Sequence, residues 1–549
     1  MTVRSGGHVL VESLLGEGVN TVFGIPGVGT LAVYDAFVDH PDIRHIEVRH
    51  EQGAIFMADG YARASGVPGV AFSSGGPGAL NTLTAMATAF NDSVPLLHIT
   101  CENPASVRRK GRGYFHDISD QFGIFRPVSD FAQQAVLPEE IPSVIHQAMY
   151  ALLNRRPRPA FVEIAGEALS AQSEVTIPAA AQRLTRQLDQ AAVEQAVALL
   201  SRAERPVIWA GGGIATPEAS ELLVQIAELT GSPIITTQKG KGAIRADHPL
   251  HVGNWANELP TRQLLAASDV LLAIGTRFSY FPTGGWSMRV PDQVIQIDMD
   301  PSEIGRNYRA DIGVVGDAAQ AMQAILNGLH DTGYQGLPAR LAEVASVLGR
   351  IDEAVGRPEE IEVLDQMRSA LPESAHVFND PTTIAFWARS VWRSFTPRTW
   401  TVPSGFGTLG FAAPAAMGAK VACPDDVCLA IMGDAGAMFT IQDLMTAVQE
   451  QIPIVLMVFN DRGYGVERRH QDHLYGRRSG VDVQPPDFVA LARSFGAGAL
   501  LVSDLSAVGS ALDSAISMAE DTGGPVLVEV PNKFRHPGYG SFGDWTDRA

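Results

Sequence analysis

Two aspartates follow two apolar runs in the last third of the sequence, and each could give a carboxylate to a bound cation. Asp434 comes soon after the run 427–432, and Asp461 comes soon after the run 453–459. Both runs are short and rich in β-branched residues, and a helix-length segment separates them, which predicts a βαβ unit with buried parallel strands. A right-handed crossover brings both carboxyl ends to one edge of the sheet, where open α/β sheets bind ligands.

The residues around Asp434 suit a phosphate as well as a cation. Gly433 and Gly436 let the backbone approach a phosphate closely, and the helix that follows offers free N–H groups. Mg²⁺ fits between carboxylates and a diphosphate because it is a hard cation that prefers oxygen ligands. An isolated Gly-Asp is more often a plain βα turn, but the pair Asn460-Asp461 after the next strand favours a ligand site.

This segment resembles the diphosphate-binding signature of thiamine diphosphate enzymes, which opens with Gly-Asp and usually closes with Asn-Asn. The resemblance implies that Asp434, Asp461 and the backbone carbonyl of Gly463 bind the metal. Asp461 replaces the common asparagine but keeps an oxygen ligand, and Ala435 in place of glycine also occurs in the acetolactate synthase branch. The resemblance implies these cofactor contacts within the segment: Gly433, Asp434, Ala435, Gly436, Asp461, Gly463 and Tyr464.

Glu51 stands in the first turn of a predicted helix that follows the strand 43–48. A glutamate is common there because it interacts favourably with the helix dipole. However, the segment 50–66 resembles the family segment that carries a glutamate which most thiamine diphosphate enzymes need for catalysis. In that family the glutamate hydrogen-bonds the aminopyrimidine ring, whose exocyclic nitrogen can then remove the thiazolium C2 proton. The resemblance therefore implies that Glu51 is catalytic and binds the cofactor.

Further cofactor contacts are implied outside these two segments. Gly78 belongs to the stretch 74–81, which resembles a glycine-rich family loop, although Gly75 stands where serine is common. Leu409 matches the bulky apolar residue that props the cofactor into a V shape, but it could equally be a core leucine. Thr382 and Thr383, which also belong to this set, could equally be plain helix caps. The full set is Pro26, Gly78, Asn81, Thr382, Thr383, Gly407 and Leu409.

Two residues are candidates for proton transfer on the substrate side. His116 falls where acetolactate synthases carry Phe-Gln, and Glu467 matches a glutamate of pyruvate decarboxylases. A solvated loop histidine and a solvated helix face explain them equally well. The histidine pair of pyruvate decarboxylases is absent, because 99–102 reads Ile-Thr-Cys-Glu. Val28 and Phe72 occupy the places of the serine and histidine of benzoylformate decarboxylases.

A chain of 549 residues is too long for one hydrophobic core. Its alternating helix and strand patterns, taken with the resemblance, predict an α/β protein of three doubly wound parallel-sheet domains. We expect a pyrimidine-binding domain at 1–168, a central Rossmann-like domain at 190–330 and a diphosphate-binding domain at 361–549. The two stretches between these domains read as linkers.

The central domain contains glycine turns after predicted strands and an acid, Asp298, at the end of another. Without a GxGxxG pattern these features are only a weak sign of a dinucleotide site. Acetolactate synthases that hold flavin carry Gly-Met-His-Gly after a His-Pro-Leu segment, whereas 253–256 here reads Gly-Asn-Trp-Ala. We therefore do not expect FAD.

Composition excludes several partners. The net charge is −19, from 41 basic and 60 acidic residues, and no basic stripe offsets it, so we expect no nucleic acid. The three cysteines have neither disulfide-framework nor zinc spacing. No apolar stretch reaches about 18 residues and no signal core is present, so we expect a cytoplasmic protein without membrane contact.

The family builds its site between two subunits, so the resemblance implies at least a homodimer and commonly a homotetramer. It implies decarboxylation of a 2-oxo acid by a thiamine diphosphate- and Mg²⁺-dependent enzyme, followed by ligation to a second carbonyl compound, as in acetolactate synthase. One alternative is a simple decarboxylase that releases an aldehyde. Another is a non-catalytic paralogue, against which Glu51, Asp434 and Asp461 argue.

Overall fold

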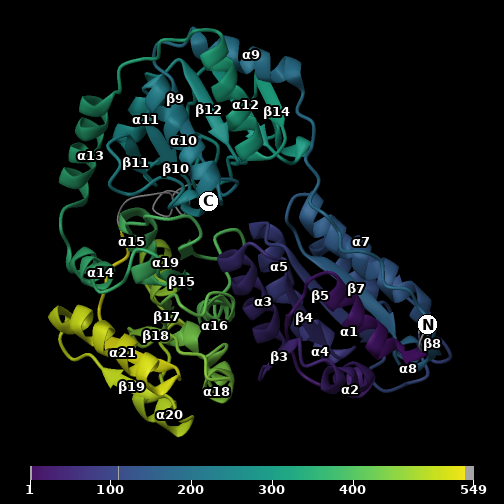
Figure 1. The fold of residues 1–549 in the computed structure, drawn as a ribbon. Coiled ribbons are helices and arrows are strands. Elements are labelled where there is room, and N and C mark those ends of the chain that lie inside the picture. The colour runs from purple at the N-terminus through teal and green to yellow at the C-terminus, as the bar shows by residue number, and fades with distance from the viewer. Residues whose placement is uncertain (1–2, 109, 538–549) are drawn as a thin grey trace.

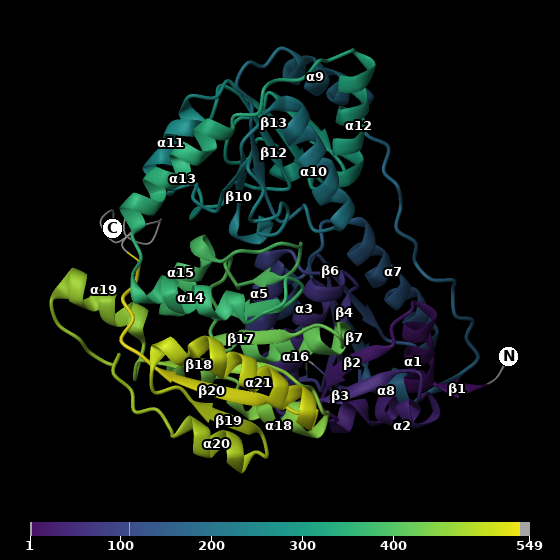
Figure 2. The same cartoon turned by 60° about the vertical axis from the view of Figure 1, so that its left-hand side comes forward.

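Three parallel sheets, each of six strands and flanked by helices, organise the chain (Figure 1). The computed structural model describes residues 3–108 and 110–537. The expectation of three doubly wound α/β domains is confirmed. The central domain lies over the first and third domains, which stand side by side (Figures 1 and 2).

The first sheet has the order β3-β2-β4-β5-β7-β6. Its strands are β2 (Thr21–Gly24), β3 (Arg44–Glu47), β4 (Gly69–Ser73), β5 (Leu96–Glu102), β6 (Phe131–Ala135) and β7 (Ala160–Ala165). Its helices are α1 (Gly6–Gly16), α2 (Leu31–Asp39), α3 (Glu51–Ser65), α4 (Pro77–Asn81), α5 (Leu83–Asp92), α6 (Gln121–Phe125), α7 (Ile141–Asn154) and α8 (Gly166–Ser170). A short strand, β8 (Gln172–Ser173), lies in the first expected linker and pairs with β1 (Arg4–Ser5).

The central sheet has the order β11-β10-β9-β12-β13-β14. Its strands are β9 (Val207–Ala210), β10 (Ile234–Thr236), β11 (His251–Gly253), β12 (Val270–Ile274), β13 (Gln293–Asp298) and β14 (Ile312–Val315). Its helices are α9 (Gln190–Ser201), α10 (Pro217–Thr230), α11 (Leu259–Ala266), α12 (Ala318–Asp331) and α13 (Leu341–Val355). The last of these corrects the expected linker after residue 330, because Val344, Val347 and Ile351 bury one face of α13 against the central domain.

The third sheet has the order β16-β15-β17-β18-β20-β19. Its strands are β15 (His376–Asn379), β16 (Trp400–Thr401), β17 (Cys428–Gly433), β18 (Val455–Asn460), β19 (Gly498–Leu501) and β20 (Val526–Pro531). Its helices are α14 (Glu359–Ser369), α15 (Thr383–Val391), α16 (Ala412–Ala422), α17 (Asp434–Ala437), α18 (Leu444–Gln449), α19 (Gly465–Tyr475), α20 (Phe488–Ser494) and α21 (Val508–Thr522).

Strands β17 and β18 are parallel neighbours, as the two apolar runs predict. The segment between them is not one helix but two short ones, because the chain bends around Gly410 at residues 438–443. Thr440 donates a hydrogen bond to the carbonyl of Gly410, and a Cβ on Gly410 would lie 2.6 Å from that of Phe439. In the third sheet the direction of strand addition reverses between β15 and β17, so their carboxyl ends form the crevice where such sheets bind ligands.

Helices α3 and α16 join the first and third domains. Two glycines let their backbones touch: a Cβ on Gly60 would lie 1.9 Å from the Ala415 carbonyl oxygen, and one on Gly418 would lie 1.9 Å from that of Met57. Because α3 begins with Glu51 and α16 follows Leu409, this contact fixes the helix of Glu51 against the helix that follows Leu409 within one chain.

A buried carboxylate, Asp92 at the end of α5, contacts all three domains. It forms ion pairs with Arg63 of the first domain (3.0 Å) and Lys239 of the central domain (2.6 Å), and it accepts the N–H of Gly405 in the third (3.0 Å). Burial alone would raise the pKa of Asp92, but the two cations lower it below its usual value. Asp92 thus anchors the loop that precedes Leu409.

No helix in the described ranges, 3–108 and 110–537, is long and apolar enough to cross a membrane.

We expect His98 to make the first domain sensitive to acid. It lies on β5, fully buried, with its Nε2 2.9 Å from the Ser73 hydroxyl, and burial lowers its pKa to about 3. The unfolded chain binds a proton below about pH 6.5, whereas the native chain does not, so stability falls as the pH drops from there towards 3, by up to about 1.4 kcal/mol per unit. We expect His98→Gln to reduce this acid slope, measured as the urea midpoint between pH 7 and 4.5.

The matched control is His330→Gln, since His330 is exposed at the end of α12. That variant should keep the wild-type slope. Equal slopes for His98→Gln and the wild type would contradict the prediction, whatever the variant does to stability at neutral pH.

Candidate cofactor site

A cavity of about 50 Å³ opens at the switch point of the third sheet. Its walls come from the carboxyl ends of β15, β17 and β18 and from the helices that follow them. All of its lining residues belong to the third domain. Ten residues expected from the sequence line it: Thr382, Thr383, Leu409, Gly433, Ala435, Gly436, Asp461, Gly463, Tyr464 and Glu467.

Asp434 and Asp461 stand together beside this cavity. Asp434 is 1% exposed, and neither of its carboxylate oxygens has a hydrogen-bond partner in the described part of the chain. Burial raises the pKa of Asp434, while nearby backbone N–H groups, that of Ala435 first, oppose the rise without reaching hydrogen-bond geometry. Burial and the neighbouring Asp434 raise the pKa of Asp461 to about 6. A buried carboxylate without partners and a half-buried one that repels it fit a divalent cation between them.

One basic side chain reaches this pair. Arg468 of α19 lies 3.6 Å from Asp461 and also pairs with Asp482 at 2.9 Å. It approaches Asp461 rather than Asp434, which leaves the more buried carboxylate for a cation. Sequence reasoning missed Arg468, because nothing in its spacing from Asp461 marks it.

The cavity also suits an anion. The N-termini of α15 and α19 both border it, and the Thr382 hydroxyl that could cap α15 makes no capping hydrogen bond. Free N–H groups and helix dipoles at this point favour a phosphate. Gly465 must remain small, because a Cβ there would lie 2.2 Å from a carboxylate oxygen of Asp461. A diphosphate with a divalent cation therefore fits the residues present.

Leu409 is held at the cavity by a carboxylate that sequence reasoning did not single out. Buried Asp380 accepts the N–H groups of Gly410 (2.8 Å), Phe411 (2.9 Å) and Ala412 (2.8 Å). Burial raises its pKa to about 6, against the effect of these three N–H groups. Its position directly after a buried strand was a usable signal. Gly407, in contrast, is exposed and is not among the residues that line the cavity.

Glu51 belongs to a second group of residues, in the first domain. Its carboxylate accepts a hydrogen bond from Asn81 at 2.9 Å. A Cβ on Gly78 would lie 3.1 Å from the same carboxylate, so only glycine leaves this oxygen undisturbed. The structure thus brings Glu51, Gly78 and Asn81 together at the N-terminus of α3.

Pro26 and His116 lie around the same glycine-rich loop, 74–78. The segment after Pro26 packs against it, since a Cβ on Gly27 would lie 2.4 Å from that of Ser74. His116 contacts Gly76: a Cβ added to Gly76 would lie 2.7 Å from the Cβ of His116. The His116 ring stacks on the exposed Phe115, with centroids 3.7 Å apart.

Two further residues that sequence reasoning missed position this loop. The amide oxygen of Gln121 accepts the N–H of Gly76 at 2.6 Å, and the sulfur of Cys101 accepts that of Gly75 at 3.1 Å. Their type and spacing gave no signal, because each reaches the loop from a distant part of the chain.

The expected residues therefore form two groups, one in the third domain and one in the first. Asp443, which follows α17 in the chain, contacts α3: its carboxylate accepts the N–H of Arg49 at 2.9 Å and lies against Gly53. Burial raises the pKa of Asp443 to about 7, with Arg49 opposing. This contact ties the helix of Glu51 to the third domain without placing Glu51 in the lining of the cavity.

Three protein-family models match the chain. They describe the thiamine pyrophosphate enzyme N-terminal TPP binding domain, at 4–124, the central domain, at 193–325, and the C-terminal TPP binding domain, at 380–530. Thiamine pyrophosphate is another name for thiamine diphosphate.

Curated relatives cover nearly the whole chain. A probable 2-ketoarginine decarboxylase, AruI, of Pseudomonas aeruginosa is 37% identical over 91% of this chain and 90% of its own length. A probable acetolactate synthase large subunit of Methanocaldococcus jannaschii is 34% identical (96% and 91%), and acetolactate synthase isozyme 3 large subunit of Escherichia coli is 31% identical (95% and 94%). The chain therefore belongs to the thiamine pyrophosphate enzymes, near the acetolactate synthases, and is a carboligase or a decarboxylase.

Proposed function

We propose that this enzyme decarboxylates a 2-oxo acid and joins the remaining fragment to a second carbonyl compound. Mg²⁺ and thiamine diphosphate would be its cofactors. The observation that carries the ligation step is that side chains at the places of the decarboxylases' histidines already bind the end of β4 and loop 74–78. Thr100 donates to the Ser73 carbonyl at 3.1 Å, and the sulfur of Cys101 accepts the N–H of Gly75.

In this proposal, Asp434, Asp461 and the carbonyl of Gly463 hold Mg²⁺. The N-termini of α15 and α19, with Thr382 and Thr383, receive the diphosphate. The bound cofactor supplies the nucleophilic carbon and the electron sink for decarboxylation. Glu51 holds a proton at the aminopyrimidine nitrogen, a task for which its carboxylate, accessible beside Gly78, is suited.

The separation of the two residue groups supports a homodimer as the smallest active form. Glu51 does not line the cavity of its own third domain, so a second copy would supply the first-domain half of each site. A homotetramer of two such dimers, with small-molecule substrates only and no nucleic acid, completes the proposed assembly. We place the enzyme in the cytoplasm.

The residues at the places of the benzoylformate decarboxylases' serine and histidine cannot protonate the decarboxylated fragment. Phe72 is buried and apolar, and Val28 is apolar. When proton donors are few, a second carbonyl compound can compete for the fragment, and ligation is favoured over aldehyde release.

A simple decarboxylase is the second candidate. His116 leans on loop 74–78 beside Glu51, and Glu467 lines the cavity, so each could deliver a proton. The relative from Pseudomonas aeruginosa is itself named as a decarboxylase.

The choice is tested by supplying the pure enzyme, Mg²⁺ and thiamine diphosphate with 2-oxo acids that have apolar or cationic side chains. Aldehyde and 2-oxo acid acceptors are added in excess, and products are identified by NMR. We expect a 2-hydroxyketone or an acetohydroxy acid to exceed free aldehyde, and His116→Gln to keep the ligation product. If aldehyde is released in an amount equal to CO₂ with every acceptor, and if His116→Gln no longer releases it, the enzyme is a decarboxylase instead.

We also propose that the central domain binds no flavin. Its turn residues Gly212, Gly213 and Gly275 border a cavity of about 530 Å³ between the domains. Asn254 and Trp255 line this cavity where flavin-binding relatives carry Met-His, and Asn254 is tied to the Arg389 carbonyl at 2.9 Å.

A further inference from the structure

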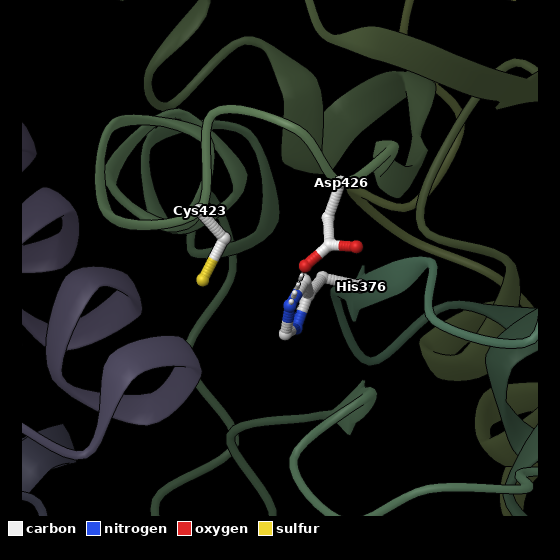
Figure 3. A group of neighbouring side chains, drawn as sticks. All are labelled: His376, Cys423 and Asp426. Atoms are coloured by element: carbon white, nitrogen blue, oxygen red, sulfur yellow. Dashed lines mark ion pairs between the residues drawn. The ribbon is translucent and has the colours of Figure 1, made fainter.

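Three side chains converge at the amino end of the third sheet, away from the cofactor cavity. They are His376 at the start of β15, Cys423 at the end of α16 and Asp426 just before β17. One ligand atom of each lies within 4.8 Å of the others, and Figure 3 shows the carboxylate of Asp426 facing the His376 ring. Asp434 lies at the other end of β17, about 20 Å along the strand by its rise per residue.

We propose that His376, Cys423 and Asp426 bind a zinc-type divalent cation. An imidazole nitrogen, a thiolate and a carboxylate oxygen are the ligands that zinc prefers, and three protein ligands leave a fourth position for water. Mg²⁺ would not compete well for this site, because it prefers an all-oxygen octahedral shell. The set thus differs in chemistry from Asp434 and Asp461.

The hydrogen bonding of His376 prepares one ring nitrogen for a cation. Its Nδ1 lies 3.1 Å from the carbonyl oxygen of Arg398, which can only accept, so Nδ1 carries the hydrogen. In the neutral ring, Nε2 then presents a lone pair to Asp426, whose oxygen lies 3.4 Å away. Two acceptors that face each other need a cation or a proton between them. A backbone carbonyl behind a histidine ligand is also the usual outer partner at metal sites.

The distances suit tetrahedral coordination. Two ligands about 2.1 Å from a zinc ion at the tetrahedral angle lie about 3.4 Å apart, which matches the separation of His376 and Asp426. The sulfur of Cys423 needs a movement of about 1 Å, well within a side-chain rotation. His376 is nearly buried, while the Asp426 side chain is 33% exposed, so an ion can arrive from solvent.

The neighbouring basic groups are directed to carbonyl oxygens rather than to the Asp426 carboxylate. Lys420 donates to the carbonyls of Pro424 (2.7 Å) and Asp426 (2.8 Å). Arg398 donates to the carbonyl of Ala215 at 2.6 Å. One carboxylate oxygen of Asp426 therefore remains directed to His376.

A metal here would join β15 to the turn between α16 and β17. Because α16 packs on α3, the helix of Glu51, the ion would stabilise the contact between the first and third domains. The ion would take no part in the cofactor chemistry, since it lies at the end of the sheet opposite Asp434.

The test uses full-length protein freed of metal by a chelator and then titrated with Co²⁺ in excess Mg²⁺. Wild type should gain a near-ultraviolet thiolate–cobalt band at one Co²⁺ per chain, and Zn²⁺ should abolish it. Cys423→Ser should lose the band and His376→Gln should bind at least tenfold more weakly. Cys428→Ala and Asp434→Ala should keep the band, which separates this site from the other thiol and from the cofactor site.

The wild-type titration decides the matter even if a variant fails to fold. Absence of the band in wild-type protein would mean that the three residues form only a histidine–aspartate ion pair beside a thiol. A folded Cys423→Ser protein with wild-type Zn²⁺ affinity would equally overturn the proposal. Neither result would bear on the proposed carboligase activity, which is measured separately.

Discussion

Replacing Glu51 by glutamine is expected to lower kcat by about 10²- to 10⁴-fold and to leave thiamine diphosphate bound. Glutamine keeps the size of the side chain, and its carbonyl can still accept the hydrogen bond from Asn81. It cannot hold or release a proton at the aminopyrimidine nitrogen. The loss should therefore appear in proton transfer and not in cofactor affinity.

Two measurements separate these effects. Hydrogen–deuterium exchange at C2 of the bound cofactor, followed by NMR after acid quenching, should slow in proportion to kcat, while calorimetry should give an unchanged affinity. Glu47→Gln is the matched control, because Glu47 ends the strand before α3, is only partly buried and does not contact Asn81. Near-wild-type exchange in Glu51→Gln would remove Glu51 from the mechanism.

The fold could be predicted because its signals are local. Parallel strands buried on both faces appear as short apolar runs, and β17 and β18 were expected from such runs almost to the residue. Helix α13 was missed although its buried residues, Val344, Val347 and Ile351, have the spacing of an amphipathic helix. Only these three of its residues are buried, so its apolar face is narrow.

The site was predictable where a motif is continuous along the chain and not where contacts are long-range. The stretches 433–436 and 461–464 are such motifs, and six of their residues line the same cavity: Gly433, Ala435, Gly436, Asp461, Gly463 and Tyr464. Asp380 and Arg468 were missed because each acts on a motif from outside it: Asp380 binds the backbone after Leu409, and Arg468 reaches Asp461. Only Asp380, which directly follows a buried strand, had a usable sequence signal. The group of His376, Cys423 and Asp426 likewise comes from two distant segments, which explains why the cysteines showed no metal spacing.

Replacing Asp434 by alanine is expected to weaken the binding of thiamine diphosphate at ordinary Mg²⁺ concentrations by at least about 100-fold. Even outer-shell partners of a metal cost 10- to about 100-fold when removed, and Asp434 is proposed as a direct ligand. Without it, a diphosphate would face Asp461 with no well-held cation between them. Calorimetry with Mg²⁺ present measures this loss, and unchanged affinity would exclude Asp434 as a ligand.

Asp461→Asn is the matched comparison, because it keeps an oxygen ligand and removes one negative charge. We expect its affinity for thiamine diphosphate to stay within about tenfold of wild type.

The two variants should also differ in thermal unfolding. The apo form of Asp434→Ala should be at least as stable as wild type, since it loses a buried carboxylate without partners. However, it should lose the increase in Tm that Mg²⁺ and thiamine diphosphate give to a protein that binds them. Asp461→Asn should keep that increase, and equal Tm shifts in both variants would contradict the proposed division of roles.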